Sequence, residues 1–235
     1  MLKFPFLKYN LSYLNSKRFL DIALAILFIS ILSPILLLVT FLLLIFNKGE
    51  IIFFQKRLGL DNKYFYIFKF ATMNKESINL PGGSITLRND PRVTKIGRIL
   101  RISKLNEMPQ LFNVFIGNMS FVGPRPLMED GYNLYSDDTK EILYKSKPGI
   151  TGISSIVFRD EEKLVTESGS DPLLFYKNYI FPYKSQLEIW YFKNKSFRVD
   201  FLIIILTGIK VICPKSNLEF KIFKSLPKDS FFHFS

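Results

Sequence analysis

The chain has 235 residues, enough for one sizeable domain with an appended element but not comfortably for two. Lys and Arg outnumber Asp and Glu by 32 to 20, and 48% of the residues are hydrophobic, a combination that favours an anionic membrane surface over nucleic acid as partner. A single cysteine, Cys213, excludes an intramolecular disulfide, and a single histidine, His233, argues against a histidine-based triad or a His-rich metal site.

Residues 19–46 are apolar apart from Asp21 and would form a helix of about 42 Å, longer than the roughly 30 Å hydrocarbon core of a bilayer. Ser33 and Pro34 lie at its centre, where proline removes a backbone donor and leaves two arms of roughly 21 Å, each too short to span alone. We expect Asp21 to pair with Arg18, three positions earlier on the same helix face. Positive charge on both flanks favours two cytoplasmic ends, and the flanking residues are Lys17, Arg18, Lys48, Lys56 and Arg57.

The residues of this segment leave two topologies open. One is a helix-break-helix that enters and leaves the membrane by the same face, and the other is an ordinary transmembrane helix kinked at proline. A cleaved signal peptide is disfavoured, because the apolar run is too long and no small-residue cleavage site follows it.

The next segment predicts a β-hairpin, since alternating β-branched and aromatic stretches surround a turn at residues 59–62. Residues 81–94 form a turn-rich loop, and Thr94 is expected to cap a short basic helix. A second amphipathic helix is predicted to begin at Asn106, and residues 160–200 to be helical. The side chains expected to share the apolar face of the first helix are Ile96, Ile99 and Leu100.

Three polar clusters are candidates for chemistry, and each has a plainer explanation. Four arginines beside the glycine-bearing loop suit phosphate groups, or else form a solvated or lipid-facing basic surface. The sequence GPRP places Arg125 between two prolines, as an anion clamp requires and as a rigid turn also would. The RDEE segment at residues 159–162 supplies acids, but such a run is typical of a helix start or an exposed face. The four arginines are Arg88, Arg92, Arg98 and Arg101.

Taken in order, the chain's motifs resemble those of the bacterial sugar transferases, specifically the small monotopic polyprenyl-phosphate phosphoglycosyl transferases. The resemblance extends over most of the chain, to about Pro214. The family's re-entrant membrane helix favours the helix-break-helix topology. The motifs that carry the resemblance are KRFLD (17–21), FFQKRLG (53–59), KFATM (69–73), NDPRVTKIGRILR (89–101), SKLNEMPQLFNVFIGNMSFVGPRP (103–126) and KPGITG (147–152).

This resemblance implies transfer of a sugar-1-phosphate from a UDP-sugar to polyprenyl phosphate at the bacterial cytoplasmic membrane, with release of UMP. In that family an Asp-Glu dyad works with Mg²⁺, the Asp attacking the β-phosphorus and the Glu binding the metal. By motif position, Glu107 matches the metal-binding acid, Lys69 the lysine of the KFRTM box, and Arg125 a phosphate-binding arginine. The implied partners are the polyprenyl lipid, the UDP-sugar, the membrane and downstream glycosyltransferases, with no nucleic acid.

The sequence departs from the family pattern at three positions. Asn106 stands at the nucleophile, Ala71 replaces the arginine of the KFRTM box, and Glu188 stands where a downstream Asp is expected. A carboxamide has no anionic oxygen with which to attack phosphorus, although asparagine caps helices well. We therefore expect Asn106→Asp to change stability by only a few tenths of a kcal/mol, because both residues serve as N-caps.

Several hypotheses follow from these departures. The chain is a working transferase that uses Glu107 or direct displacement, or a non-catalytic relative that binds UDP-sugar or organises partner enzymes. A third hypothesis is that Asn106 was introduced deliberately to silence an active enzyme. Ala71 is a second change at the same site, and it favours natural divergence instead. A basic nucleic-acid-binding membrane protein is a remote fourth.

The predicted architecture is an α+β fold that is predominantly helical. Residues 1–47 form an N-terminal arm and a re-entrant membrane helix broken at Ser33-Pro34. Residues 48–214 form a phosphoglycosyl transferase domain on the cytoplasmic face, with a small β-hairpin and interfacial amphipathic helices. Residues 215–235 form an irregular C-terminal tail.

Overall fold

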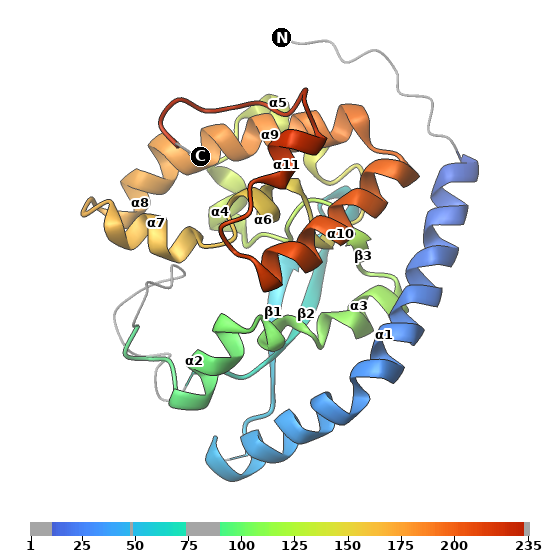
Figure 1. The fold of residues 1–235 in the computed structure, drawn as a ribbon, viewed down its shortest axis with the longest axis vertical. Coiled ribbons are helices and arrows are strands. Elements are labelled where there is room, and N and C mark those ends of the chain that lie inside the picture. The colour runs from blue at the N-terminus through green and yellow to red at the C-terminus, as the bar shows by residue number, and fades with distance from the viewer. Residues whose placement is uncertain (1–10, 48, 74–89, 233–235) are drawn as a thin grey trace.

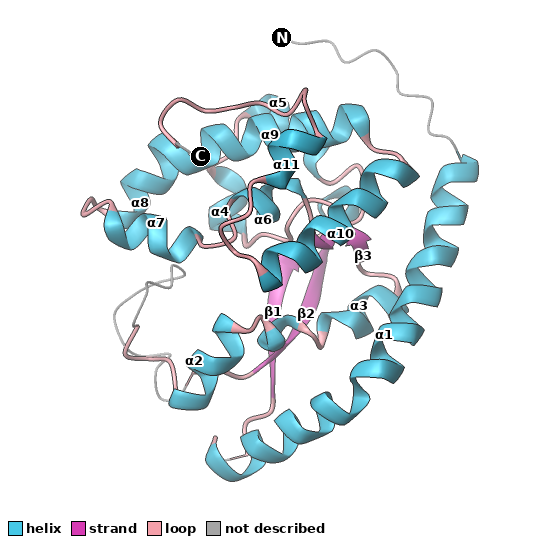
Figure 2. Ribbon diagram, in the orientation of Figure 1, coloured by secondary structure: helices cyan, strands magenta, loops and turns pink. Residues whose placement is uncertain are grey.

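The computed structural model describes residues 11–47, 49–73 and 90–232, and it confirms a predominantly helical α+β chain with a small β-hairpin (Figures 1 and 2). The described helices are α1 Leu11–Phe46, α2 Lys95–Ile102, α3 Gln110–Ile116, α4 Glu129–Asn133, α5 Asp137–Leu143, α6 Ile153–Val157, α7 Glu161–Glu167, α8 Pro172–Phe175, α9 Phe181–Asn194, α10 Phe197–Ile212 and α11 Leu218–Ile222. The strands are β1 Ile52–Leu58, β2 Tyr64–Phe70, β3 Ser120–Val122 and β4 Gly149–Thr151, and short turns of helix lie at Leu60–Asn62, Leu105–Glu107 and Tyr176–Ile180.

The long helix α1 lies along one side of the molecule and bends partway along its length (Figure 1). Its segment Asn15–Phe46 is long and apolar enough to cross a membrane, and only 11% of its most apolar stretch is buried in the molecule. Large side chains such as Phe19 and Leu37 stay exposed, at 72% and 70% of their surface. This exposure suits contact with lipid rather than with a protein core.

The predicted break at Ser33-Pro34 is a position inside one continuous helix rather than a gap between two helices. Proline has no N–H to give to the carbonyl of Ser30, four residues earlier. The Ser33 hydroxyl donates to that carbonyl at 2.8 Å and so replaces the missing hydrogen bond. The helix can therefore continue past Pro34, a residue that commonly causes helix bending.

The first arm of α1 is tied to the rest of the molecule by polar side chains. Lys17 forms an ion pair with Asp200 of α10 at 2.5 Å, and Arg18 donates to the carbonyls of Val114 and Phe115 at the end of α3. The expected pair between Arg18 and Asp21 is replaced by other contacts. Asp21 is buried and accepts hydrogen bonds from the Ser120 hydroxyl and the Phe121 amide of β3, at 3.0 Å each.

The predicted hairpin is confirmed, with β1 and β2 antiparallel and Phe53 opposite Lys69. Its turn at residues 59–62 places Asp61 and Asn62 in the left-handed region, at φ values of 53° and 58°. Asp and Asn tolerate this conformation better than most residues, which explains the turn.

A second sheet, which the sequence did not indicate, consists of β3 and β4 in parallel, with Ser120 opposite Gly149 and Val122 opposite Thr151. The two strands meet at glycines, since a Cβ on Gly149 would lie 2.2 Å from the Gly123 nitrogen. This close approach explains the glycines of GPRP and KPGITG. It also fixes the origin of the loop that carries Arg125.

Helix α2 is capped as predicted, because the Thr94 hydroxyl accepts from the Gly97 amide at 2.9 Å. The prediction of which side chains form its apolar face is only partly confirmed. Leu100 is buried and Ile96 is packed beside it, but Ile99 is 65% exposed. The helix C-terminal to it, α3, starts at Gln110 rather than at Asn106.

The main core gathers α1, α3, α6, α9 and α10 around β3 (Figure 1). The tail is more ordered than the sequence indicated, since it includes α11 and its residues Phe223, Leu226 and Phe232 are buried in this core. Both arms of α1 also contribute, Ala25 to the main core and Leu43 to a smaller cluster with Phe70 and Leu100. The N-terminal segment is therefore packed with the domain rather than separate from it.

Candidate functional site

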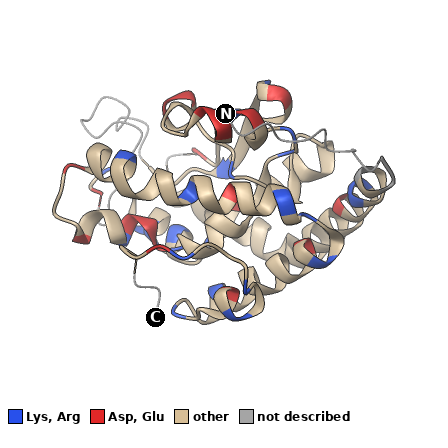
Figure 3. Cartoon of the chain, turned by 90° about the horizontal axis from the view of Figure 1, so that it is seen from above, with Lys and Arg blue, Asp and Glu red and all other residues tan. Residues whose placement is uncertain are grey.

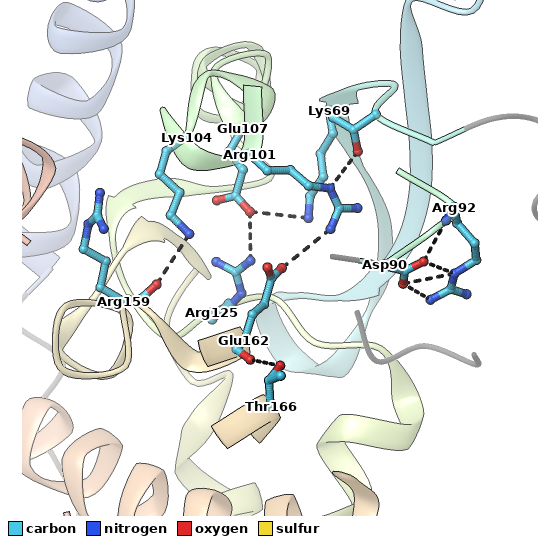
Figure 4. Close-up of polar contacts among 11 residues, drawn as sticks. Lys69, Asp90, Arg92, Arg101, Lys104, Glu107, Arg125, Arg159, Glu162 and Thr166 are labelled. Atoms are coloured by element: carbon cyan, nitrogen blue, oxygen red, sulfur yellow. Dashed lines mark hydrogen bonds and ion pairs between the residues drawn. The ribbon is translucent and has the colours of Figure 1, made fainter. Parts of the chain in front are cut away.

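Three separate parts of the chain meet at one carboxylate (Figure 4). Lys69 lies near the end of β2, Glu107 ends the short turn Leu105–Glu107, and Arg125 follows β3. Arg125 donates from Nη2 to the Oε1 atom of Glu107 at 2.8 Å, and the Lys69 Nζ lies 3.5 Å from the same oxygen. The structure thus brings together three residues that the sequence singled out.

Each of these three charged side chains has its pKa shifted by at least one of the others. Burial raises the pKa of Glu107, but Arg125 and Lys69 outweigh it and hold this pKa far below its usual range. Burial lowers the pKa of Lys69 to about 8, against the opposing effect of Glu107. The charge of Glu107 raises the pKa of Arg125. At neutral pH, Glu107 is therefore an anion held between two cations.

The backbone around Arg125 is held by two hydrogen-bonded contacts. The Tyr144 hydroxyl donates to the carbonyl of Arg125 at 3.0 Å and accepts from the Leu127 amide at 2.9 Å. The Gly149 amide donates to the carbonyl of Pro124 at 2.9 Å. The GPRP segment is thus a rigid turn whose guanidinium contacts the carboxylate of Glu107, and a role as a clamp for a ligand anion stays a prediction.

Asn106 is the middle residue of the turn Leu105–Glu107, which follows Lys104 in the left-handed conformation at φ 60°. Its predicted role as the N-cap of the next helix is wrong, since α3 starts four residues later and Pro109 occupies the cap position. The Asn106 Oδ1 atom is buried and accepts no hydrogen bond from the part of the chain that the structure describes. A neutral acceptor therefore stands beside Glu107, where the resemblance expects an anionic nucleophile.

Arg57 belongs to the site although sequence reasoning treated it only as a flanking charge. In an antiparallel pair, residues opposite each other share a face, and so do alternate residues of one strand. Phe53 is opposite Lys69, so Arg57, four positions after Phe53, lies on the same face as Lys69. This alternation is the signal that would have found it. Its neighbour Lys56 lies on the other face, 3.9 Å from the ring centroid of Tyr64.

The Arg57 guanidinium is largely buried and incompletely paired. It donates from Nη2 to the Gln55 Oε1 at 2.5 Å, while its Nε is buried and has no hydrogen-bond partner among the described residues. Burial and, to a smaller extent, the positive charge of Arg125 together lower its pKa to about 10. Arg57 is thus a partly buried cation whose polar atoms are not fully satisfied by the described residues.

Two acids of the RDEE segment reach toward this region. The segment begins α7, as expected of a helix start. Glu162 lies 3.6 Å from Nη1 of Arg101, whose Nε donates to the Thr72 hydroxyl at 2.9 Å (Figure 4). Glu161 is paired with Lys184 of α9 at 2.7 Å. Sequence reasoning missed both ion pairs, because they depend on the packing of α7 and not on a local pattern.

The other predicted phosphate-binding residues occupy different surroundings. Arg92 is buried and forms several hydrogen bonds with Asp90, to one side of the Glu107 contacts (Figure 4). Arg98 is exposed on α2. Arg88 lies outside the described residues. Figure 3 shows that Lys and Arg positions lie on several separate elements of the described chain, so the positive charge is not confined to this site.

Glu188 lies in α9 and is 4% exposed. It accepts a hydrogen bond from the Ser154 hydroxyl of α6, and burial raises its pKa to about 7. No contact joins it to Glu107 among the described residues. A role for Glu188 in substrate binding stays a prediction.

Residues 12–214 match the model of the family described as bacterial sugar transferase. The chain belongs to this family. It is similar to an undecaprenyl-phosphate glucose phosphotransferase of Komagataeibacter xylinus, with 39% identity over 60% of this chain and 27% of the relative. It is also similar to an uncharacterized sugar transferase, EpsL, of Bacillus subtilis (strain 168), with 35% identity over 83% of this chain and 87% of the relative.

A further relative is a UDP-glucose:undecaprenyl-phosphate glucose-1-phosphate transferase of Klebsiella pneumoniae, 35% identical over 85% of this chain. The match covers 41% of that protein and 27% of the Komagataeibacter one, so the chain spans less than half of each. By family, this chain is a phosphoglycosyl transferase.

The residues present are a poor fit for the Mg²⁺ ion that the family resemblance implies. Mg²⁺ takes oxygen ligands and is usually held by one or two carboxylates together with substrate phosphates. Among the described residues, Glu107 is the carboxylate that contacts both Lys69 and Arg125, and its Oε1 is already engaged by both. Within the described residues, no group of three or more His, Cys, Asp or Glu side chains is placed to hold a metal ion.

Proposed function

We propose that the chain transfers a sugar-1-phosphate from a UDP-sugar to polyprenyl phosphate at the cytoplasmic face of the bacterial membrane, in assembly of a surface polysaccharide or glycoconjugate. The observation that carries the proposal is the convergence of Lys69, Glu107 and Arg125 in a chain whose family match covers residues 12–214. The names of the relatives, with undecaprenyl phosphate as acceptor and UDP-glucose as donor, support these substrate classes.

The packing of α1 supports a re-entrant membrane topology. Its first arm is bound to the domain through Lys17 and Arg18, and its second arm packs through Val39 and Leu43 against Phe70. A helix that crossed the bilayer straight would carry its two ends to opposite sides. Because both arms contact the same domain, α1 enters and leaves by the face on which the domain lies.

The site residues have defined tasks in this proposal. Arg125, Lys69 and Arg57 bind the diphosphate, since positioning and charge neutralisation dominate phosphoryl transfer. Glu107 holds Arg125 and Lys69 in place before substrate arrives, through contacts of 2.8 and 3.5 Å. The exposed apolar surface of α1 supports contact of the chain with a lipid acceptor.

Asn106 leads to direct displacement rather than to a covalent intermediate on this residue. An oxygen of the polyprenyl phosphate forms a bond to the β-phosphorus while the bond from that phosphorus to the bridging oxygen breaks. UMP leaves with the electron pair of the broken bond, and no proton transfer is required. The same carboxamide favours a second candidate, a non-catalytic relative that binds the UDP-sugar or scaffolds partner glycosyltransferases.

The test is UMP release by nanodisc-held chain, with Asn106→Asp measured beside it on a panel of UDP-sugars in the presence of Mg²⁺. We expect the native chain to release UMP only when polyprenyl phosphate is present, because Asn106 cannot take the sugar phosphate. The aspartate variant is expected to release a first equivalent without the lipid. Release by the variant alone would favour the non-catalytic candidate, and release by neither protein would contradict the proposed function.

A further inference from the structure

The region around Glu107 carries more positive than negative charge. Several basic side chains act electrostatically on this one carboxylate. Among the described residues, the other acids that offset them are Glu162 and Asp90, which act on Arg101, and Glu161, which acts on Arg125. Glu161 is also paired with Lys184, and Asp90 with Arg92. The basic side chains whose charges interact with Glu107 are Arg57, Lys69, Arg101, Lys104 and Arg125.

This balance is unfavourable for a divalent cation. Where the family has two adjacent acids, this chain has Glu107 and the neutral carboxamide of Asn106. The Oε1 atom of Glu107 already accepts a hydrogen bond from Arg125 at 2.8 Å and lies 3.5 Å from the Lys69 Nζ. A metal ion bound at Glu107 would lie close to Arg125 and Lys69, two cations that repel it.

The same balance is favourable for a diphosphate. Two ionised phosphates bring the negative charge that the cluster lacks, and guanidinium groups bind phosphate oxygens through paired hydrogen bonds. Arg57 adds a specific indication, because its Nε is buried and has no partner among the described residues. A buried donor without a partner is costly, and a ligand oxygen would satisfy it.

We infer that this chain binds the diphosphate of its sugar nucleotide directly on Arg57, Lys69 and Arg125, without requiring a divalent metal ion. The inference rests on the proposed function, since the diphosphate is that of the proposed donor. The family resemblance implies a site that works with Mg²⁺, and the inference departs from it on this point. The departure follows from the neutral side chain of Asn106 and from the excess of basic side chains around Glu107.

The experiment measures binding of UDP to the full chain in phosphatidylcholine nanodiscs by calorimetry, once with EDTA and once with Mg²⁺. We expect dissociation constants that agree within about fivefold between the two buffers. Binding that weakens by more than this in EDTA would overturn the inference alone. If UDP does not bind in either buffer, both the inference and the proposed function are contradicted. Uridine, which lacks phosphates, is the ligand control.

Variants separate the contribution of Arg57 from that of general charge. Arg57→Gln is expected to weaken UDP binding in EDTA roughly tenfold or more, as the loss of a charge-assisted hydrogen bond predicts. Lys56→Gln removes the same charge one residue away on the opposite face and is expected to leave binding unchanged. Arg57→Lys retains the charge and guards against misfolding, with an intermediate loss expected. Equal losses for Arg57→Gln and Lys56→Gln would contradict the inference.

The Asn106→Asp variant tests the origin of metal independence. A second carboxylate beside Glu107 adds negative charge that repels the diphosphate and attracts a divalent cation. We expect this variant to bind UDP more weakly than the native chain in EDTA and to recover with Mg²⁺. If the ratio of the UDP dissociation constants in EDTA and in Mg²⁺ is the same for the variant and the native chain, Asn106 does not set the metal requirement. That result would count against the inference.

Discussion

At the scale of single residues, Tyr144 determines where Arg125 points. Its hydroxyl joins the carbonyl of Arg125 to the amide of Leu127, and its ring is buried against Tyr132. Tyr144→Phe keeps the ring but leaves two part-buried backbone groups without this partner, so we expect a loss of about 1 kcal/mol in the free energy of unfolding. UDP binding is expected to weaken as well. Chemical denaturation and calorimetry measure both, and an unchanged UDP affinity would contradict the positioning role.

A second prediction at this scale concerns Glu188 and pH. Burial raises its folded-state pKa to about 7, above the value of the unfolded chain. Between these two values the folded state binds more protons, so stability is greatest at low pH and is lost as pH rises toward 7. We expect Glu188→Gln to reduce this decline by up to roughly 3 kcal/mol. The free energy of unfolding measured at pH 5 and pH 8 tests this prediction. An equal change in that free energy between the two pH values for the variant and the native chain would contradict it.

At the scale of elements, Gly97 allows α2 to lie against the end of β2. A Cβ at this position would be 2.1 Å from the Thr72 carbonyl oxygen. Gly97→Ala must therefore displace the helix, with an expected loss of about 1 to 3 kcal/mol and a weaker contact between Arg101 and Thr72. Gly208→Ala in α10 is the control, since nothing lies within 4 Å and alanine should stabilise that helix. Thermal unfolding compares the two, and a stable Gly97→Ala protein would contradict this packing.

The same elements show which features a sequence can predict. The cap at Thr94 and the turn at residues 59–62 depend on neighbours in the chain, and both are confirmed. The cap at Asn106 is wrong because Lys104 adopts a left-handed conformation that redirects the chain. Ion pairs such as Glu162 with Arg101 join segments distant in sequence, so they follow from tertiary packing that no local pattern encodes.

At the scale of the whole molecule, the two arms of α1 and the domain form one packed unit. The first arm is held by an ion pair at Lys17 and by the buried carboxylate of Asp21, contacts that are costly to break singly. The second arm packs through Val39 and Leu43 in a cluster with Phe70, so both arms contact the same domain on either side of the bend. This packing supports the re-entrant topology that we propose for α1, in addition to the length and hydropathy of the helix.

This leads to a prediction about sidedness that the chain's own cysteine makes testable. Cys213 is exposed beside α10 and reports the side on which the domain lies. Ser16 is exposed on the first arm of α1, so Ser16→Cys combined with Cys213→Ser reports the side of that arm. Because Lys17 and Arg18 bind the domain, both cysteines should react with a membrane-impermeant maleimide in inverted vesicles and be protected in intact spheroplasts. Labelling at position 16 from the outside, with Cys213 still protected, would mean that α1 crosses the bilayer and that its anchors to α3 and α10 do not form in the membrane.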